Sequence, residues 1–209
     1  PADPVETAGA LAAAASLAQL PWSDAARQFQ ARLALMRRLE PEEGWPDLSD
    51  DALAADRAWL ANYLNGHLNG ISRIADLARL DMAAVLRATL AALPDGWQRG
   101  ARLDAALPSH LALPKGRAAV DYCQPVPLAA ARAQLFYGLT ETPKLAGGRA
   151  ELRIALLSPA GRPVAITGDL AAFWRGAWAD ARRDMRGRYP RHDWPENPAA
   201  DGGAKVSRP

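Results

Sequence analysis

The sequence predicts an α+β protein: a helical region at residues 1–100, a small antiparallel β domain with two helices at residues 101–197, and a flexible tail at residues 198–209. Two observations predict this class. Apolar residues recur at helical spacing in the first hundred residues, and from about Leu107 they alternate with polar residues. A chain of 209 residues, 49% of them hydrophobic, can bury the core of one or two domains. An OB-like barrel is one arrangement open to the β domain.

The helical region is predicted from capping residues and periodic apolar positions. Helices are expected after Ser23 up to Pro41, after Ser49 up to Gly66, and over residues 72–80 and 81–93. Serine caps helix amino termini, whereas proline and glycine end helices. The apolar face of the first of these helices holds Ala26, Phe29, Leu33 and Met36. We therefore expect a small helical bundle that ends at the turn over residues 94–96.

The β domain is predicted from two stretches with alternating apolar and polar residues. The first pair of strands flanks a turn at residues 114–116, and the second flanks a turn at residues 158–161. Each pair is expected to form an antiparallel hairpin. Between the hairpins, Pro127 is expected to begin a helix that Gly138 ends.

The last predicted helix, over residues 170–187, has the clearest two-faced pattern in the sequence. At about 100° per residue, its apolar positions fall within about 80° of Leu170, and three arginines fall at about 120–160°. The apolar positions are Phe173, Trp174, Ala177, Trp178, Ala181 and Met185, and the arginines are Arg175, Arg182 and Arg186. We expect Trp174 and Trp178 to be buried and the arginines to face away from the core.

Charge is distributed unevenly along the chain. Residues 1–100 hold 9 basic and 13 acidic residues and residues 101–209 hold 16 and 10, so the net charge of +2 is the sum of −4 and +6. The carboxy-terminal half is therefore the candidate for contact with an anionic partner.

The sequence lacks the residues that several kinds of chemistry need. It contains no G-x-x-x-x-G-K-[ST] phosphate loop, and its three histidines are too far apart to form a local metal site. No catalytic residue, metal ligand or small-molecule substrate is predicted. The single cysteine, Cys123, allows no internal disulfide, which favours the cytoplasm. Its side chain is expected to be buried on a strand. No apolar run is long enough to cross a membrane.

The most informative stretch covers residues 175–195. Six arginines up to Arg191 face two aspartates, and beyond the predicted helix cations alternate with aromatic rings. Guanidinium groups pair with phosphates and rings stack on unpaired bases, so the stretch suits single-stranded nucleic acid. The candidate RNA-binding residues are Arg175, Arg182, Arg183, Arg186, Arg188, Tyr189, Arg191 and Trp194. Two alternatives remain open: the arginines form a solvated helix face, and Tyr189 and Trp194 belong to a strap that fastens the chain end to its own domain.

Five stretches of the sequence resemble the carboxy-terminal region of bacterial HrpB-type ATP-dependent RNA helicases of the DEAH-box class. The resemblance extends over nearly the whole chain, and the last three of these stretches are long and particular. The stretches are LPWSDAA at 20–26, WPDLSD at 45–50, LLSPAGRP at 156–163, DLAAFWRG at 169–176 and MRGRYPRHDWP at 185–195.

The resemblance implies a longer protein whose upstream motor core, made of two RecA-like domains, binds ATP and Mg²⁺. Because the sequence begins with Pro1 rather than Met, we expect the chain to be a piece of such a protein. The ATPase motifs have no counterpart in it, so the resemblance implies no enzymatic activity for this chain. It implies an accessory domain that contacts single-stranded RNA and braces the motor core. The alternative is a protein-docking or purely structural module without direct RNA contact.

Overall fold

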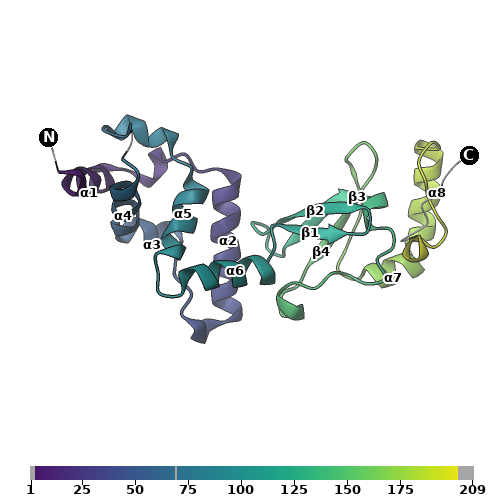
Figure 1. The fold of residues 1–209 in the computed structure, drawn as a ribbon. Helices are drawn as coiled ribbons and strands as arrows, with labels where there is room; N and C mark the ends of the chain where they lie inside the picture. Colours follow the sequence, from purple (N-terminus) through teal and green to yellow (C-terminus); the bar gives the residue numbers. More distant parts are fainter. Residues whose placement is uncertain (1–2, 69, 202–209) are drawn as a thin grey trace, which may run out of the picture. The chain divides into compact units, whose positions relative to one another are not determined.

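The computed structural model describes residues 3–68 and 70–201. The chain divides into two units, Pro1–Ala105 and Ala106–Pro209, each with its own core. Figure 1 shows that the first unit is helical and that the second holds a sheet with helices, so the predicted α+β class is confirmed. The division lies between Ala105 and Ala106 rather than at residue 100, because a helix that the sequence pattern did not reveal occupies Gly96–Ala106.

The helices of the first unit pack mainly in pairs. Helix α1 (Pro4–Ala14) packs against α4 (Ala58–Gly66), and α2 (Asp24–Leu39) packs against α5 (Met82–Ala91). Further elements are α3 (Asp50–Ala55), α6 (Gly96–Ala106) and 3-10 turns at Leu17–Gln19, Pro41–Glu43 and Ile74–Arg79. The apolar face predicted after Ser23 is buried as expected. Among residues 3–68 and 70–201, no helix combines the length and the apolar composition that crossing a bilayer requires.

Two of the predicted helices differ in the structure. The helix expected between Ser49 and Gly66 is two helices, because Asp56 is extended and its carboxylate accepts a hydrogen bond from the N–H of Ala58 at 2.8 Å. This local bond ends α3 and starts α4. The segment expected at residues 72–80 forms a 3-10 helix rather than an α-helix, with Asp76 Oδ2 accepting two backbone N–H groups at 3.0 Å.

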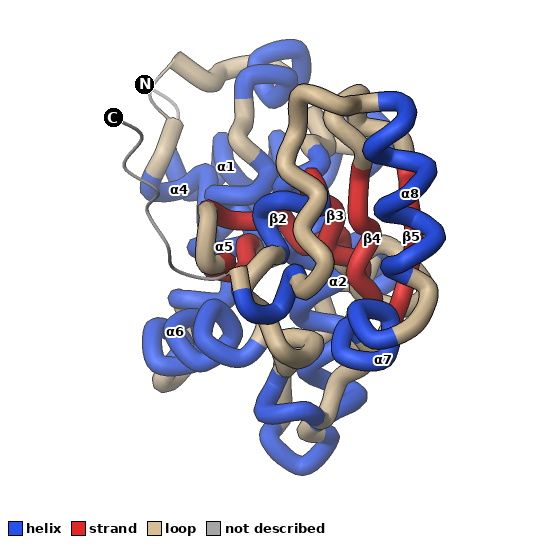
Figure 2. Tube along the Cα trace, turned by 90° about the vertical axis from the view of Figure 1, so that its right-hand side faces the viewer, coloured by secondary structure: helices blue, strands red, loops and turns tan. Residues whose placement is uncertain are grey.

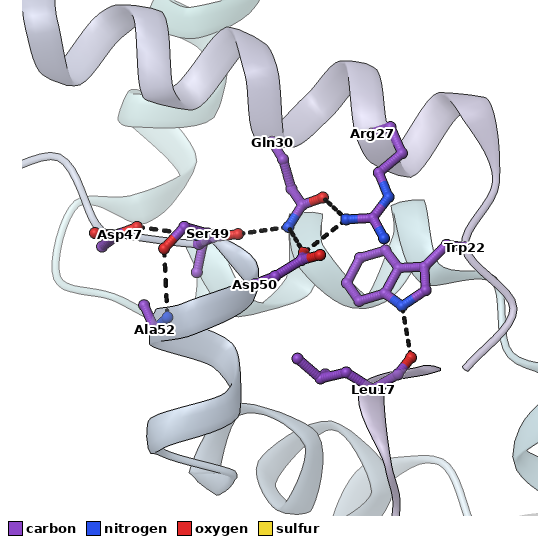
Figure 3. Close-up of polar contacts among 9 residues, drawn as sticks. Leu17, Trp22, Arg27, Gln30, Asp47, Ser49, Asp50 and Ala52 are labelled. Carbon is purple, nitrogen blue, oxygen red and sulfur yellow. Dashed lines mark hydrogen bonds and ion pairs between the residues drawn. The ribbon is translucent and has the colours of Figure 1, made fainter. Parts of the chain in front are cut away.

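A polar cluster around Asp50 fixes the start of α3 against α2 (Figure 3). Asp50 Oδ1 accepts hydrogen bonds from Arg27 at 2.6 Å and from Gln30 at 3.0 Å, and Gln30 also donates to the carbonyl of Leu48. The guanidinium of Arg27 lies 4.2 Å from the centre of the Trp22 ring. The bond from Gln30, followed by that from Arg27, holds the pKa of Asp50 below its ordinary value. Two of the five helicase-like stretches are thus joined by contacts that stabilise the fold.

A buried arginine links α2 to α6. Arg32 is only 2% exposed, and it donates to Asp104 Oδ1 at 2.5 Å and to the carbonyl of Leu103 at 3.4 Å. Removing one partner of a buried charge leaves the other uncompensated, which is costly. The pair therefore secures α6 to the rest of the first unit.

The sheet of the second unit has the strand order β1-β2-β3-β4-β5. Strands β1 to β4 are labelled in Figure 1, and β2 to β5 are labelled in Figure 2. The strands are β1 (His110–Leu113), β2 (Gly116–Asp121), β3 (Leu128–Arg132), β4 (Arg153–Leu157) and β5 (Pro163–Thr167). Both predicted hairpins are confirmed, because β1 pairs with β2 and β4 pairs with β5 in antiparallel fashion. In the part of the chain that is described, β1 and β5 are the two edges, so the sheet is open and does not close into an OB-like barrel.

The helix expected from Pro127 to Gly138 is wrong. Residues Leu128–Arg132 form β3, which pairs with β4 in parallel from Leu128 opposite Arg153 to Arg132 opposite Leu157, and only a short 3-10 turn follows at Ala133–Phe136. The local sequence Leu-Ala-Ala-Ala-Arg has high helix propensity, but the five-residue ladder with β4 overrides it.

Two smaller predictions for the second unit are corrected. Cys123 is exposed, because it follows the end of β2 rather than lying within the strand. The tail expected at residues 198–209 begins with an ordered turn at Pro198–Ala200, in which Pro198 is buried and accepts a hydrogen bond from the N–H of Gly138 at 2.8 Å. The rest of that predicted tail, residues 202–209, lies outside the described residues.

The turn between α5 and α6 requires glycine at its last position. Asp95 has a φ of 52°, and a Cβ added at Gly96 would lie 2.1 Å from the carbonyl oxygen of Leu90. At Gly100, one turn further along α6, a Cβ would meet nothing within 4 Å. Both glycines lower helix propensity, so the sequence pattern did not predict α6, but only Gly96 is required by steric contact.

We predict that Gly96→Ala lowers the free energy of unfolding by about 1–3 kcal/mol, because the added methyl group forces α5 and α6 apart. The matched control, Gly100→Ala, should raise the free energy of unfolding by about 0.5–1 kcal/mol, since alanine favours an exposed helix. Urea titration followed by circular dichroism measures both. Equal effects of the two substitutions would contradict the close approach at Gly96.

Candidate nucleic-acid interface

The predicted last helix is two helices, α7 (Leu170–Arg175) and α8 (Trp178–Arg188), which Figure 1 shows as separate turns of ribbon. Asp169 caps α7 by accepting the N–H of Ala172 at 2.8 Å. Gly176 then leaves the helical region, with φ −119° and ψ −93°. Arg175 therefore ends α7 and does not continue the arginine row of α8, which corrects the single stripe predicted from a continuous helix.

The two helices are held by an aromatic cluster, which consists of Tyr137, Phe173, Trp174, Trp178 and Trp194. Trp178 lies at its centre and is 1% exposed. Its ring contacts that of Trp174 edge-on at 5.2 Å between centroids, that of Tyr137 at 5.8 Å and that of Trp194 at 6.2 Å. The predicted burial of Trp174 and Trp178 is confirmed.

Hydrogen bonds fasten residues 189–201, here called the carboxy-terminal strap, onto this cluster. Trp178 Nε1 donates to the carbonyl of Pro195 at 2.9 Å, and Trp194 Nε1 donates to the carbonyl of Tyr189 at 3.0 Å. Arg182 Nε donates to the carbonyl of Trp194 at 2.8 Å. The strap therefore has a fixed path over α8.

Tyr137 is the buried polar member of the aromatic cluster. Its hydroxyl donates to the carbonyl of Asp193 at 3.3 Å, and the ammonium of Lys115 lies 5.3 Å from the ring centre. Burial, followed by the negative charges of Asp193 and Asp201, raises the pKa of the phenol above its ordinary value of 10.0. The neutral phenol is thus strongly favoured in the folded chain.

Two of the predicted RNA-binding residues serve to hold the strap. Trp194 is 5% exposed inside the aromatic cluster, so its ring offers no open face to a base, which corrects the stacking role predicted for it. Arg182 pairs with Glu196 at 3.1 Å in addition to its bond to the carbonyl of Trp194. Trp194 therefore belongs to a strap that fastens the chain end to its own domain, which was one of the alternatives left open by the sequence. Glu196 was missed as a partner because the charges of the arginine-rich stretch were counted only as far as Arg191.

The other predicted residues lie on the surface. Arg183 pairs with Asp180 at 3.1 Å and Arg188 pairs with Asp184 at 2.9 Å, all with largely exposed side chains. Among the described residues, no ion pair engages the exposed arginines of this region that remain, which are Arg175, Arg186 and Arg191. Tyr189 is half-buried, with its ring 6.2 Å from that of His192.

The arginines of α8 do not share one face. At about 100° per residue, Arg183 and Arg186 are about 60° apart, whereas Arg188 is about 160° from Arg186. The structure therefore brings Arg183 and Arg186 to one side of α8 and directs Arg188 to another. In the described part of the chain, no group of three or more His, Cys, Asp or Glu side chains is arranged to hold a metal.

Comparison with known proteins relates the chain to the carboxy-terminal part of one family of helicases. Residues 59–198 match the family model described as ATP-dependent helicase C-terminal, HrpB_C. The chain is 39% identical over 185 residues to the ATP-dependent RNA helicase HrpB of Escherichia coli, a match that covers 88% of this chain and 22% of the relative. The chain thus spans about a fifth of that relative's length.

Two solved structures give the same result. The crystal structure of the E. coli DExH-box NTPase HrpB superposes with a TM-score of 0.76 and 38% identity over 88% of this chain and 22% of that one. The crystal structure of the Escherichia coli DEAH/RHA helicase HrpB superposes with a TM-score of 0.68 and 34% identity over 90% and 23%. The fold and these likenesses together define a helicase-associated α+β module. The chain belongs to the family of HrpB-type ATP-dependent helicase carboxy-terminal domains.

We predict that Tyr137 ionises only when the second unit unfolds. Because its pKa is raised in the folded state, the stabilisation is fully present below the ordinary pKa of 10.0 and is lost as the pH rises above it. The free energy of unfolding of the parent chain should therefore fall above pH 10 by about 1.4 kcal/mol per pH unit more steeply than that of Tyr137→Phe. Urea titrations at several alkaline pH values measure the slopes. Identical slopes for both chains would show that Tyr137 titrates normally.

Proposed function

We propose that this chain is an accessory domain of an ATP-dependent RNA helicase that contacts single-stranded RNA through α8 and the strap and braces the motor core. One observation carries the RNA contact: exposed guanidinium groups without ion-pair partners in the described chain, at Arg175, Arg186 and Arg191, lie in a region whose fold is fixed. The E. coli relative named as an RNA helicase supports the choice of nucleic acid.

The paired arginines are also available to phosphate. The side chains of Arg183 and Asp180 are 80% and 82% exposed, and those of Arg188 and Asp184 are 66% and 49% exposed. Exposed ion pairs of this kind contribute little and are screened by salt. A phosphate, which guanidinium binds through two parallel hydrogen bonds, can displace the aspartates at small cost. Tyr189, which is half-buried and follows Arg188 directly in the chain, is the residue we propose for stacking on a base.

The chemistry of the helicase is assigned to other parts of the longer protein. The sequence of this chain contains no phosphate-binding loop, and we propose that ATP and Mg²⁺ bind in the motor core. Repeatable ATP turnover by the repurified chain alone would contradict this assignment. The cytoplasm is the proposed compartment, on the basis of the single cysteine.

The bracing role is supported by an exposed aromatic residue in the first unit. Trp97, at the start of α6, is 72% exposed, and Leu93, four residues earlier, is 38% exposed. A large aromatic side chain as exposed as Trp97 is typical of surfaces that dock on another protein. This observation also favours the alternative function, a docking module without direct RNA contact.

We predict that Arg186→Ala and Arg191→Ala each weaken binding of single-stranded RNA and lower the slope of log affinity against log salt by about 0.7. Each change removes one phosphate contact and should act similarly on all sequences. Fluorescence anisotropy of labelled RNA over a salt series measures both quantities, and circular dichroism checks the fold.

Arg38→Ala is the matched control, because Arg38 is an exposed arginine of α2 in the first unit. It should leave the affinity and the slope unchanged. If Arg186→Ala and Arg191→Ala also bind like the parent chain, α8 is a solvated helix face and the docking function replaces the RNA contact.

A further inference from the structure

A hollow of about 350 Å³ opens between the end of α7 and the carboxy-terminal strap. It is lined by Thr140, Trp174, Arg175, Glu196 and Asn197, which come from three separate segments of the second unit. Its volume is at the small end of the roughly 300–1,000 Å³ typical of ligand pockets. Arg175 was grouped with the arginines of α8 from the sequence, but it ends α7, before the break at Gly176, and lines this hollow.

The walls of the hollow are fixed by contacts that do not involve a ligand. Trp174 Nε1 donates to the carbonyl of Leu139 at 2.9 Å, which holds the indole in place. The strap is fastened on both sides of Glu196, by the bond from Trp178 to the carbonyl of Pro195 and by that from Gly138 to the carbonyl of Pro198. The backbone around the hollow is therefore fixed before a ligand binds, whereas the side chain of Glu196 is 83% exposed.

The polar groups of the hollow form a complementary set of donors and acceptors. Arg175 makes no ion pair within the described chain, not even with Glu196. Glu196 Oε1 is held by Arg182 at 3.1 Å, and Oε2 of the same carboxylate has no ion-pair partner among the described residues. One free guanidinium thus lies in the same hollow as a carboxylate that can accept one more hydrogen bond.

A ribonucleotide matches this set. Its phosphate is a bidentate partner for a guanidinium, and its 2′-hydroxyl is a donor that a carboxylate can accept. DNA lacks the 2′-hydroxyl. Glu196 pairs with Arg182 through one oxygen, and a carboxylate repels phosphate, so the second oxygen suits a hydroxyl donor of the ligand rather than its backbone charge.

We propose that the hollow binds one ribonucleotide of the RNA strand, with Arg175 on the phosphate and Glu196 accepting the 2′-hydroxyl, and that it distinguishes RNA from DNA. This inference rests on the proposed RNA contact and adds a selectivity that the arginines of α8 do not supply. Guanidinium groups on a helix surface bind the backbones of RNA and DNA alike. Selectivity for the sugar therefore depends on Glu196.

The test compares oligouridine with oligodeoxyuridine of the same length by fluorescence anisotropy, since the two differ only in the 2′-hydroxyl. The parent chain should bind oligouridine about tenfold more tightly, the effect of one hydrogen bond to a charged group. Glu196→Ala should bring the ratio close to one, and Arg175→Ala should weaken the binding of both strands. Arg186→Ala should weaken both strands equally and keep the parent ratio.

Glu151→Ala is the matched control, because Glu151 is also an exposed carboxylate of the second unit with an arginine partner, Arg153 at 3.5 Å. It should leave the ratio unchanged. Equal binding of the two strands by the parent chain, or an unchanged ratio in Glu196→Ala, overturns the proposed selectivity while the RNA contact stands. Failure of the parent chain to bind either strand overturns both proposals.

Discussion

The burial of Trp178 among the other aromatic rings is the constraint on which the second unit depends. This single side chain contacts the rings of Tyr137, Phe173, Trp174 and Trp194 and donates its indole N–H to the strap. A fully buried tryptophan contributes a large apolar area, and its ring contacts add to that. Because α7, α8 and the strap all pack on it, the cluster determines which arginines are used to hold the structure and which face outward.

The aromatic cluster thus gives different roles to arginines that look alike in the sequence. Arg182 donates to the carbonyl of Trp194 and pairs with Glu196, whereas Arg186, four residues later, has no ion-pair partner in the described chain. The first unit shows the same principle, since Arg32 is buried against Asp104 and Arg27 completes the cluster around Asp50. An excess of arginine is therefore weak support for nucleic-acid binding until the partners of each guanidinium are known. In this region, Arg175, Arg186 and Arg191 are the exposed arginines without an ion-pair partner among the described residues.

Sequence patterns predicted what local periodicity controls. The helix after Ser23, both hairpins and the burial of Trp174 and Trp178 follow from residues close together in the chain. The wrong predictions concern residues whose structure depends on distant partners. Leu128–Arg132 forms a strand because β4 lies beside it, and Trp194 is buried because the strap packs its ring against Trp178. The hollow that contains Arg175 and Glu196 could not be predicted, since it needs both the break at Gly176 and the path of the strap.

We propose that RNA lies on the exposed surface of α8 and the strap, which the aromatic cluster positions. Photo-cross-linking with 4-thiouridine-labelled single-stranded RNA, followed by mass spectrometry of the attached peptides, tests this contact most directly. We expect cross-linked peptides from residues 175–197, including Tyr189, and we expect them to be lost in Trp178→Ala, in which the cluster is disrupted. Cross-links confined to the first unit, for example around Trp97, would contradict the account.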